Sequence, residues 1–399
     1  MESSYKIDKL DNYIEQIRGI SYKSKDISED SKEGYKVVLR ANSIKDNKLI
    51  LNDLLYVKEE LIKEKQFIKC NDILMAASSG SKDIVGKCVQ IKDDTEYTFG
   101  AFCKLIRCKE NINPNYVAYF FRTPYYRATI SAVVNGANIN NLKNEHIDNL
   151  LIPLPSKEIQ KRIVDILDKA QELIDKRKEQ IEQLDELVKS RFIEMFGDPV
   201  KNPKGWEKKK LSDECNIITG NTPSRKIDEY YGDYIEWIKS DNITNAEIYL
   251  TTAKEYLSEK GLDVGRSVEA NSILMTCIAG SLKCIGNVAI ADRKVAFNQQ
   301  INGIETLENN VYFMFEQFNL SQQYIQSTIN MALKGILSKS QLSELEFIFP
   351  PLELQNEFAK FFVEVHNVRL NMENSLKELE DNFNSLIQKA FRGELFNIV

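Results

Sequence analysis

The sequence Asn71-Asp72-Ile73-Leu74-Met75-Ala76, followed by Gly80-Ser81, returns 200 residues later as Asn271-Ser272-Ile273-Leu274-Met275-Thr276, followed by Gly280-Ser281. The repeat extends beyond this block, because offsets of 195 to 201 residues connect further matched residues. Examples are Gly19 with Gly220, Gln160 with Gln355, and Phe196 with Phe391. A unit of this length is much longer than a solenoid repeat. Each copy is therefore expected to form a domain of its own.

The composition is that of an ordinary globular protein, with 43% hydrophobic and 28% charged residues among 399. This length suits two or three domains. The sequence has no basic-then-apolar leader, and its most apolar stretch, residues 272–282, is too short to cross a bilayer. We therefore expect a cytoplasmic protein. The net charge of −6 argues against a general nucleic-acid coat, since non-specific binding depends on Lys and Arg neutralising phosphates.

Few residues of this chain are suited to metal binding or to histidine-based catalysis. The seven cysteines are an odd number without a secretory signal, which favours reduced thiols. The pairs Cys103/Cys108 and Cys277/Cys284 lack both the spacing and the neighbouring histidines of a zinc site. Only two histidines occur in the whole sequence. We expect no metal site.

Each copy ends in a long segment whose apolar residues recur in alternating steps of four and three, the pattern of a coiled-coil seam. Each helix would be roughly 60 Å long at about 1.5 Å per residue, and its seam needs a partner to be buried. An antiparallel coiled coil between the two copies meets this need, and two ordinary amphipathic core helices are the alternative. The expected seam comprises Ile163, Leu167, Ile174, Ile181, Leu184, Val188, Phe358, Phe362, Val365, Met372, Leu376, Leu379 and Phe383.

Prolines and glycines mark the expected domain boundaries. Pro153 and Pro155 precede the first helix, Pro350 and Pro351 precede the second, and Gly197-Asp198-Pro199 ends the first. The globular parts alternate short β-type runs with helices and Gly/Ser/Asn/Asp turns, which predicts an α+β fold of two repeated domains. The expected division is a first domain at 1–152, a helix at 153–197, a second domain at 198–348, and a helix and tail at 349–399.

Three blocks of sequence together resemble the specificity subunits of type I restriction-modification systems. They are Ile152-Pro153-Leu154-Pro155 to Gln160, answered by Phe349-Pro350-Pro351-Leu352 to Gln355; Ser190-Arg191-Phe192 to Pro199, answered by Ser385 to Leu395; and Gly205-Trp206 to Ser224. The resemblance covers essentially the whole chain, although the first copy has no counterpart of Gly205-Trp206. It implies two target-recognition domains, each followed by one long helix.

The candidate DNA-binding residues lie in polar loops that follow shared strands. Small residues that end in a cation suit close approach of the backbone to a phosphate, and paired Gln amides can bind adenine bidentately. Each of these residue types is also common in ordinary surface turns. The candidates are Ser79, Ser81, Lys82, Lys87, Thr222, Ser224, Arg225, Lys226, Lys283, Gln299 and Gln300.

An enzyme is the main alternative. Asn113-Pro114-Asn115-Tyr116 comes within one residue of the Asn-Pro-Pro-Tyr/Phe motif of adenine methyltransferases, and Glu207-Lys208-Lys209 imitates the end of a nuclease motif. The sequence contains no Gly-rich loop after a strand for S-adenosylmethionine and no Walker-type loop for ATP. We therefore expect no catalytic residues. A coiled-coil scaffold whose tandem domains bind something other than DNA is a further alternative.

The resemblance also implies partners. The chain would bind double-stranded DNA, direct two adenine-methylating modification subunits and the restriction subunits to a bipartite site, and act in defence against foreign DNA. The helix pair would set the spacing of the half-sites and dock the modification subunits. S-adenosylmethionine, ATP and Mg are expected only in the partner subunits, and no membrane association is expected.

Overall fold

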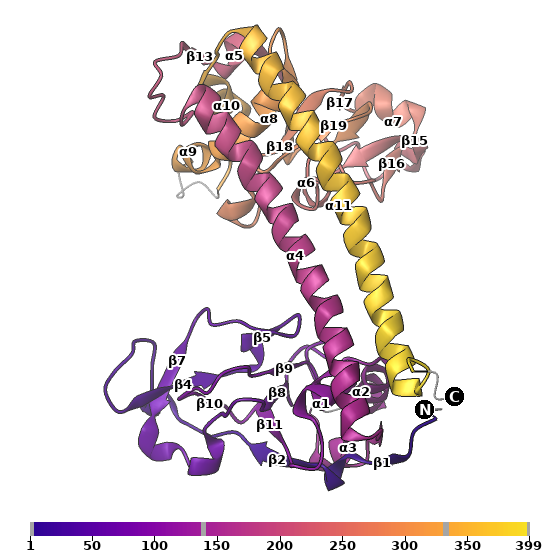
Figure 1. The fold of residues 1–399 in the computed structure, drawn as a ribbon. Helices are drawn as coiled ribbons and strands as arrows, with labels where there is room; N and C mark the ends of the chain where they lie inside the picture. The colour runs from indigo at the N-terminus through magenta and orange to yellow at the C-terminus, as the bar shows by residue number, and fades with distance from the viewer. Residues whose placement is uncertain (1–3, 137–140, 330–334, 397–399) are drawn as a thin grey trace. The chain divides into compact units, whose positions relative to one another are not determined.

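The computed structural model describes residues 4–136, 141–329 and 335–396. The chain divides into two compact units, which we call unit 1 (Met1–Arg177 with Ser375–Val399) and unit 2 (Lys178–Asn374). Both boundaries fall inside the two long helices, α4 (Lys157–Phe196) and α11 (Leu352–Arg392). Each unit therefore contains one globular domain together with half of each long helix (Figure 1).

Unit 1 is built on a four-stranded antiparallel sheet in the order β2-β11-β8-β9, formed by Ile14–Arg18, Cys103–Cys108, Ile73–Ala76 and Cys88–Gln90. A second sheet has the order β10-β4-β7-β3, formed by Thr98–Phe99, Tyr35–Leu39, Leu55–Lys58 and Ile27–Ser28. Two short pairs complete the strands: β1 (Ile7–Lys9) with β12 (Leu151–Pro153), and β5 (Ile44–Lys45) with β6 (Lys48–Leu49). The helices besides α4 and α11 are α1 (Pro114–Phe120), α2 (Pro124–Gly136) and α3 (Asn144–Asp148).

Unit 2 repeats this plan. Its antiparallel sheet has the order β14-β21-β18-β19, formed by Cys215–Thr219, Ile301–Thr306, Ser272–Thr276 and Val288–Ala291. The second sheet has the order β16-β15-β20-β17, formed by Tyr256–Leu257, Tyr231–Ile238, Val295–Phe297 and Ser267–Val268. β13 (Lys208–Lys210) pairs with β22 (Glu346–Ile348). The further helices are α5 (Leu211–Glu214), α6 (Ser240–Thr244), α7 (Glu259–Val264), α8 (Val311–Leu320), α9 (Gln322–Ser327) and α10 (Lys339–Glu344).

The repeated apolar block forms the central strands β8 and β18, which are buried on both faces. Alternate residues of a strand point to opposite sides of the sheet. Ile73 and Met75 therefore join the core with α1 and α2, while Leu74 and Ala76 join a second core with the other sheet. The strand β18 is divided in the same way. A strand covered on both faces needs a continuous apolar sequence, and the α+β prediction is confirmed.

The two long helices pack against each other within each unit. The first half of α4 and the last part of α11 share the unit 1 core, and the last part of α4 and the first half of α11 share the unit 2 core. The helices therefore run antiparallel, as predicted. In the described residues no helix is both long and apolar enough to cross a bilayer.

The predicted seam is buried most completely near the helix ends. Ile163, Leu167, Ile174, Phe358, Phe362, Val365 and Phe383 are buried, whereas Ile181, Leu184, Val188, Met372, Leu376 and Leu379 are half-buried. The ends also pack on the globular domains, since Phe383 contacts Tyr119 of α1 and Phe192 stacks on Phe313 of α8. The seam residues near the ends are thus both coiled-coil residues and domain-core residues.

A buried glutamine ties each long helix to the globular domain of its own unit. Gln160 accepts a hydrogen bond from the Asn113 backbone N–H (3.0 Å) and donates to the Pro155 carbonyl (3.0 Å). Gln355 does the same with Asn310 (2.9 Å) and Pro350 (2.8 Å). A buried amide needs all of these partners. The repeated proline-then-glutamine motif is therefore the start of each helix together with its anchor.

Candidate DNA interface

Three loops of unit 1 converge at one edge of the antiparallel sheet. β11 runs antiparallel to both β2 and β8, so the ends of β2 and β8 lie beside the start of β11. The Ser78 N–H donates to the Phe102 carbonyl (3.0 Å), and the Ile20 N–H donates to the Phe99 carbonyl (2.9 Å). At Gly19 an added Cβ would lie 2.2 Å from the Gly100 oxygen. The shared glycine is required because two backbones meet there.

The same three loops converge in unit 2. The Ile278 N–H donates to the Gln300 carbonyl (3.1 Å), and an added Cβ at Gly220 would lie 2.1 Å from the Asn298 oxygen. This contact places the loop after Gly220 beside the turn that carries Gln299. The hydroxyl of Thr222 donates to the Gln299 side-chain oxygen. The structure therefore brings together two predicted segments that are 77 residues apart.

The predicted DNA-binding residues are largely accessible. Two of them are half-buried: Ser79, whose hydroxyl accepts from the Ser81 N–H (3.2 Å), and Gln300, whose side-chain oxygen accepts from the Asn298 amide (3.1 Å). The exposed ones are Ser81, Lys82, Lys87, Thr222, Ser224, Arg225, Lys226, Lys283 and Gln299. Accessibility is compatible with DNA contact, and their role stays a prediction.

Arg225 is held by neighbours that the sequence reasoning missed. Its guanidinium lies over the rings of Tyr231 (4.5 Å to the centroid) and Trp237 (5.0 Å) and pairs with Glu255 (2.6 Å). Lys239 also pairs with Glu255 and lowers the pKa of that carboxyl together with Arg225. Cations interleaved with aromatic residues along 225–239 were the available signal.

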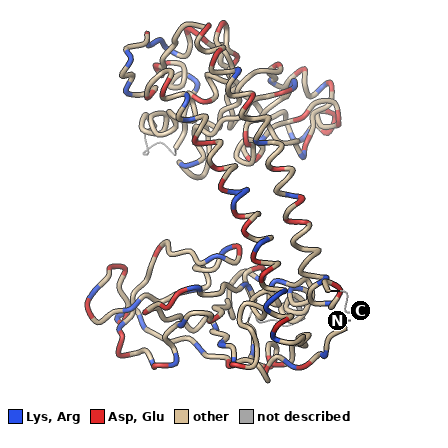
Figure 2. The backbone as a smooth tube through the Cα atoms, in the orientation of Figure 1, with Lys and Arg blue, Asp and Glu red and all other residues tan. Residues whose placement is uncertain are grey.

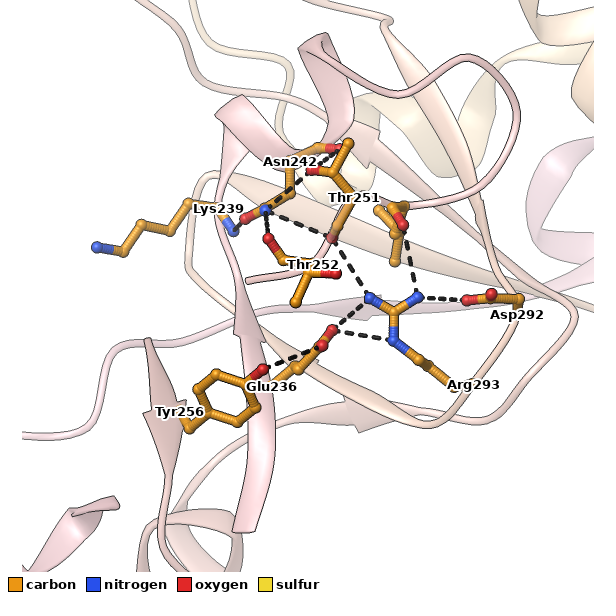
Figure 3. Close-up of polar contacts among 9 residues, drawn as sticks. Glu236, Lys239, Asn242, Thr251, Thr252, Tyr256, Asp292 and Arg293 are labelled. Carbon is orange, nitrogen blue, oxygen red and sulfur yellow. Dashed lines mark hydrogen bonds and ion pairs between the residues drawn. The ribbon is translucent and has the colours of Figure 1, made fainter. Parts of the chain in front are cut away.

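A polar network centred on Arg293 supports this surface in unit 2 (Figure 3). The guanidinium is bound by the carboxylates of Glu236 and Asp292 and by the Thr251 carbonyl (3.3 Å). Asn242 donates to the Thr251 hydroxyl (3.1 Å). Figure 3 shows the Lys239 side chain pointing away from the cluster. The network joins β15, α6 and the turn between β19 and β20, so it fixes these three elements relative to one another.

Phe102 is a second candidate that the sequence reasoning missed. It is 70% exposed, although a large aromatic side chain is normally buried. Its turn lies beside the loop that contains Ser79 and Lys82, through the Ser78 hydrogen bond described above. Exposed aromatic residues can stack on bases or contact the thymine methyl group. Counting back 198 residues from Gln300 would have identified this position.

Asn113 and Tyr116, which suggested a methyltransferase, have structural roles. Asn113 caps α1 by accepting from the Asn115 N–H (2.9 Å), and the fully buried Tyr116 donates to the Pro153 carbonyl (2.9 Å). Neither residue can hold a target base in this arrangement. Burial raises the pKa of five thiols to about 12, so they are protonated at neutral pH: Cys88, Cys103, Cys108, Cys215 and Cys277. Among the described residues, no group of three or more His, Cys, Asp or Glu is placed to hold a metal ion.

The charges of both globular domains are mixed in sign. Figure 2 shows Lys and Arg interspersed with Asp and Glu along the traced backbone. Many cations are paired, as in the bidentate contact of Arg107 with the buried Asp72 (2.8 and 2.6 Å). Local loops, rather than a broad basic face, are therefore the part of each unit suited to phosphate contact.

Comparison with known proteins agrees with this arrangement. The sequence profile of the type I restriction modification DNA specificity domain matches residues 7–185 and, a second time, residues 203–381. The chain belongs to this family. The resemblance drawn from the proline and glutamine motifs is thereby confirmed, and the chain is a specificity subunit, a non-catalytic DNA-recognition component of a restriction-modification complex.

Relatives of the specificity subunit match along most of their length. The specificity subunits of type I restriction enzymes StySPI of Salmonella potsdam and EcoKI of Escherichia coli strain K12 are 28% and 29% identical to this chain. Both alignments cover 95% of this chain and 86% of the relative. The match thus includes both domains and both helices.

Solved structures share the fold of the specificity subunit. A chain from a study of complex assembly and conformational transition of the type I restriction-modification system has a TM-score of 0.59 at 16% identity, covering 98% of this chain and 100% of that one. The S subunit of such a system from M. genitalium has a TM-score of 0.54 at 14% identity, with coverage of 98% and 96%. At these identities the likeness is one of fold.

Proposed function

We propose that each unit of the specificity subunit recognises one half of a bipartite, asymmetric DNA site. One observation carries the proposal: the same three loops converge twice on the same sheet edge, with a glycine at the same place (Gly19 and Gly220) but different side chains around it. A shared backbone that presents Phe102 in one unit and Gln300 in the other suits two different half-sequences. Specificity lies in such base-edge contacts, while phosphate contacts only position the protein.

In this proposal Lys82, Lys87, Lys226 and Lys283 contact phosphates, and the Gln299–Gln300 turn contacts bases. The helix pair sets the spacing of the half-sites and docks two modification subunits, and restriction subunits join through them. S-adenosylmethionine, ATP and Mg belong to those partners. The complex works in the cytoplasm, which suits seven free cysteines.

A domain exchange tests the proposal. Residues 1–150 are replaced by the matching domain of a relative, and methylated adenines are mapped in cells that also carry the modification subunits. One half of the methylated sequence should change and the other should stay. If both halves changed together, the units would not be independent readers.

A second measurement addresses catalysis. The purified chain, freed of modification subunits, is incubated with S-adenosylmethionine and DNA. No methyl transfer is expected. Transfer by the isolated chain would place an active site in the globular domains after all.

A further inference from the structure

An arginine of unit 1 fills a space between α1 and the two long helices. The Arg122 guanidinium lies over the rings of Phe383 (4.6 Å to the centroid) and Tyr119 (5.2 Å), and it donates to the Gln171 side-chain oxygen (2.6 Å). Tyr119 in turn donates to Asp168 (2.5 Å). The scaffold therefore accommodates a guanidinium at this place, between an aromatic layer and a hydrogen-bond acceptor.

The repeat identifies the corresponding place in unit 2. The helix caps Asn113 and Asn310 are 197 residues apart, and each binds the anchoring glutamine of its unit. The stacked pair Tyr116–Phe391 (4.7 Å) also corresponds to Phe313–Phe196 (4.9 Å) at offsets of 197 and 195. The same offsets pair Tyr119 with Glu316, Arg122 with Asn319, Gln171 with His366, and Phe383 with Val188.

All four replacements line one cavity in unit 2. The cavity has a volume of about 430 Å³ and lies between α4, α8 and α11, within the range of roughly 300–1,000 Å³ found for ligand pockets. It is open because Asn319 and Val188 are much shorter than arginine and phenylalanine. Phe315, Phe362 and Ile248 supply apolar walls.

The polar groups of the cavity suit a cation. Four carboxyl groups, those of Asp185, Glu186, Glu247 and Glu316, line it against two cations, Lys189 and Arg369. Both cations are already paired: Lys189 with Glu186 (3.6 Å), and Arg369 with Asp185 (2.7 Å), Glu247 (3.4 Å) and Glu373 (2.8 Å). The lining thus contains more carboxyl groups than cations.

Two side chains that line the cavity can accept hydrogen bonds. Glu316 is 91% buried, and burial raises the pKa of its carboxyl to about 7. The Nδ1 atom of His366 is buried, and among the described residues it has no hydrogen-bond partner. Burial lowers the pKa of His366, so its ring is neutral at pH 7 and one ring nitrogen can accept. Asn319 already forms a side-chain hydrogen bond with the Glu316 carboxyl, whereas a buried acceptor without a donor, as at His366 Nδ1, is costly.

We propose that this cavity receives the guanidinium of an arginine side chain from a docked modification subunit, occupying the place that Arg122 fills in unit 1. This proposal rests on the docking of modification subunits put forward above. The arginine donates to the Glu316 carboxylate and to His366 Nδ1 and packs against the apolar walls. Glu316 releases its proton to solvent as the guanidinium enters, so that the buried pair is neutral overall. Affinity should therefore rise between pH 6 and 8.

The two histidines of the chain make a direct test possible. The full chain is labelled at histidine, and n-butylguanidinium is added while the imidazole NMR signals are followed. The His366 signal should move in a saturable way and the His146 signal of unit 1 should not. Neutral n-butylurea, of nearly the same shape, should move neither. Absence of a specific His366 response would overturn the guanidinium site.

A filled variant tests the partner. Val188→Phe with Asn319→Arg rebuilds the unit 1 packing inside unit 2, and Glu316→Gln removes the acceptor charge without changing its size. The filled variant should not respond to n-butylguanidinium. Both variants should bind purified modification subunit at least about tenfold more weakly, as expected when a buried arginine anchor is lost. Asn367→Gln, an exposed position of α11 that does not line the cavity, is the control and should bind as wild type does.

The outcomes separate the two proposals. If His366 responds but the filled variant binds the modification subunit as tightly as wild type, the cavity is a guanidinium site and its assignment to this partner is wrong. If the wild-type chain binds no modification subunit, docking itself fails, and the NMR titration still decides whether the cavity takes a guanidinium.

Discussion

The carbonyl oxygens of Phe102 and Gln300 hold the same loop in the two units. Phe102 accepts from the N–H groups of Ala77 (2.9 Å) and Ser78 (3.0 Å), and Gln300 accepts from those of Cys277 (2.8 Å) and Ile278 (3.1 Å). The two units share these backbone hydrogen bonds, but the side chain at this position is phenylalanine in unit 1 and glutamine in unit 2. A position that is fixed by its main chain can change its side chain without loss of the fold.

This relationship predicts two separate losses of specificity. Gln300→Ala should weaken binding of the cognate site by about tenfold, on the scale of a base contact worth roughly 1–3 kcal/mol. Its effect should be confined to one half-site, and Phe102→Ala should affect the other. Binding of single-base variants of the DNA site by the assembled methyltransferase measures this. Equal relaxation at both halves in either variant would contradict the assignment.

Lys82→Ala and Lys283→Ala should act in a different way. Both cations are exposed at loops that we assign to phosphate contact, so their loss should weaken binding for every sequence alike. The slope of log K against log salt should become shallower by about 0.9 per lost contact. Lys201→Ala, exposed in the turn after α4 and outside the candidate loops, is the control. A change of base preference, with the slope unchanged, would show that these lysines contact bases.

The strands, the long helices and the family could be predicted from sequence because each rests on a local or repeated pattern. The Ile73–Met75 block is apolar throughout because β8 is covered on both faces, and its recurrence indicates a second domain. The anchoring role of Gln160 was not visible, since it depends on the backbone N–H of Asn113, 47 residues away.

The candidate site was predictable only in part. Flexible Gly/Ser loops and exposed lysines can be recognised locally, but the pairing of Arg225 with Glu255 depends on a contact 30 residues away. Phe102 could not be distinguished from a buried core aromatic residue by sequence, because its exposure depends on the fold. The cavity around Glu316 arises from shortened residues on two different helices, which no single segment reveals.

Glu255→Gln should increase non-specific DNA binding. Glu255 neutralises both Arg225 (2.6 Å) and Lys239, so removal of its charge leaves two accessible cations on the candidate surface. The slope of log K against log salt should become steeper by the equivalent of about one or two phosphate contacts at most. Electrophoretic or anisotropy titrations with non-cognate DNA at several salt concentrations measure this. An unchanged slope would mean that Arg225 does not face DNA.

Glu316→Gln should stabilise the chain in a pH-dependent way. Burial raises the pKa of Glu316 from 4.5 to about 7, so at pH 4 the carboxyl is mostly protonated in both the folded and the unfolded chain. Above pH 4.5 the unfolded chain releases the proton first, and stability falls until pH 7. The variant escapes this loss, which is on the order of 3 kcal/mol at most. Its melting temperature should exceed that of wild type at pH 8 and match it at pH 4.

The alternative result for Glu316 is informative as well. If the variant were destabilised equally at pH 4 and pH 8, the Glu316 side chain would stabilise the fold through its hydrogen bonds or packing, and the cost of burying its charge would be small. Glu308→Gln is the matched control, because it makes the same substitution at an exposed carboxyl.

The length of the helix pair should set the spacer of the DNA site. Seven residues inserted between Gln180 and Leu184 of α4, with seven more between Ser375 and Leu379 of α11, keep both seams in phase. Each insertion adds roughly 10 Å of helix, the length of about three base pairs. Methylation mapping should then show the same two half-sequences separated by about three more bases. Insertion in α4 alone breaks the antiparallel register and should abolish methylation. An active complex with both insertions and an unchanged spacer would mean that the helices do not determine the distance between half-sites.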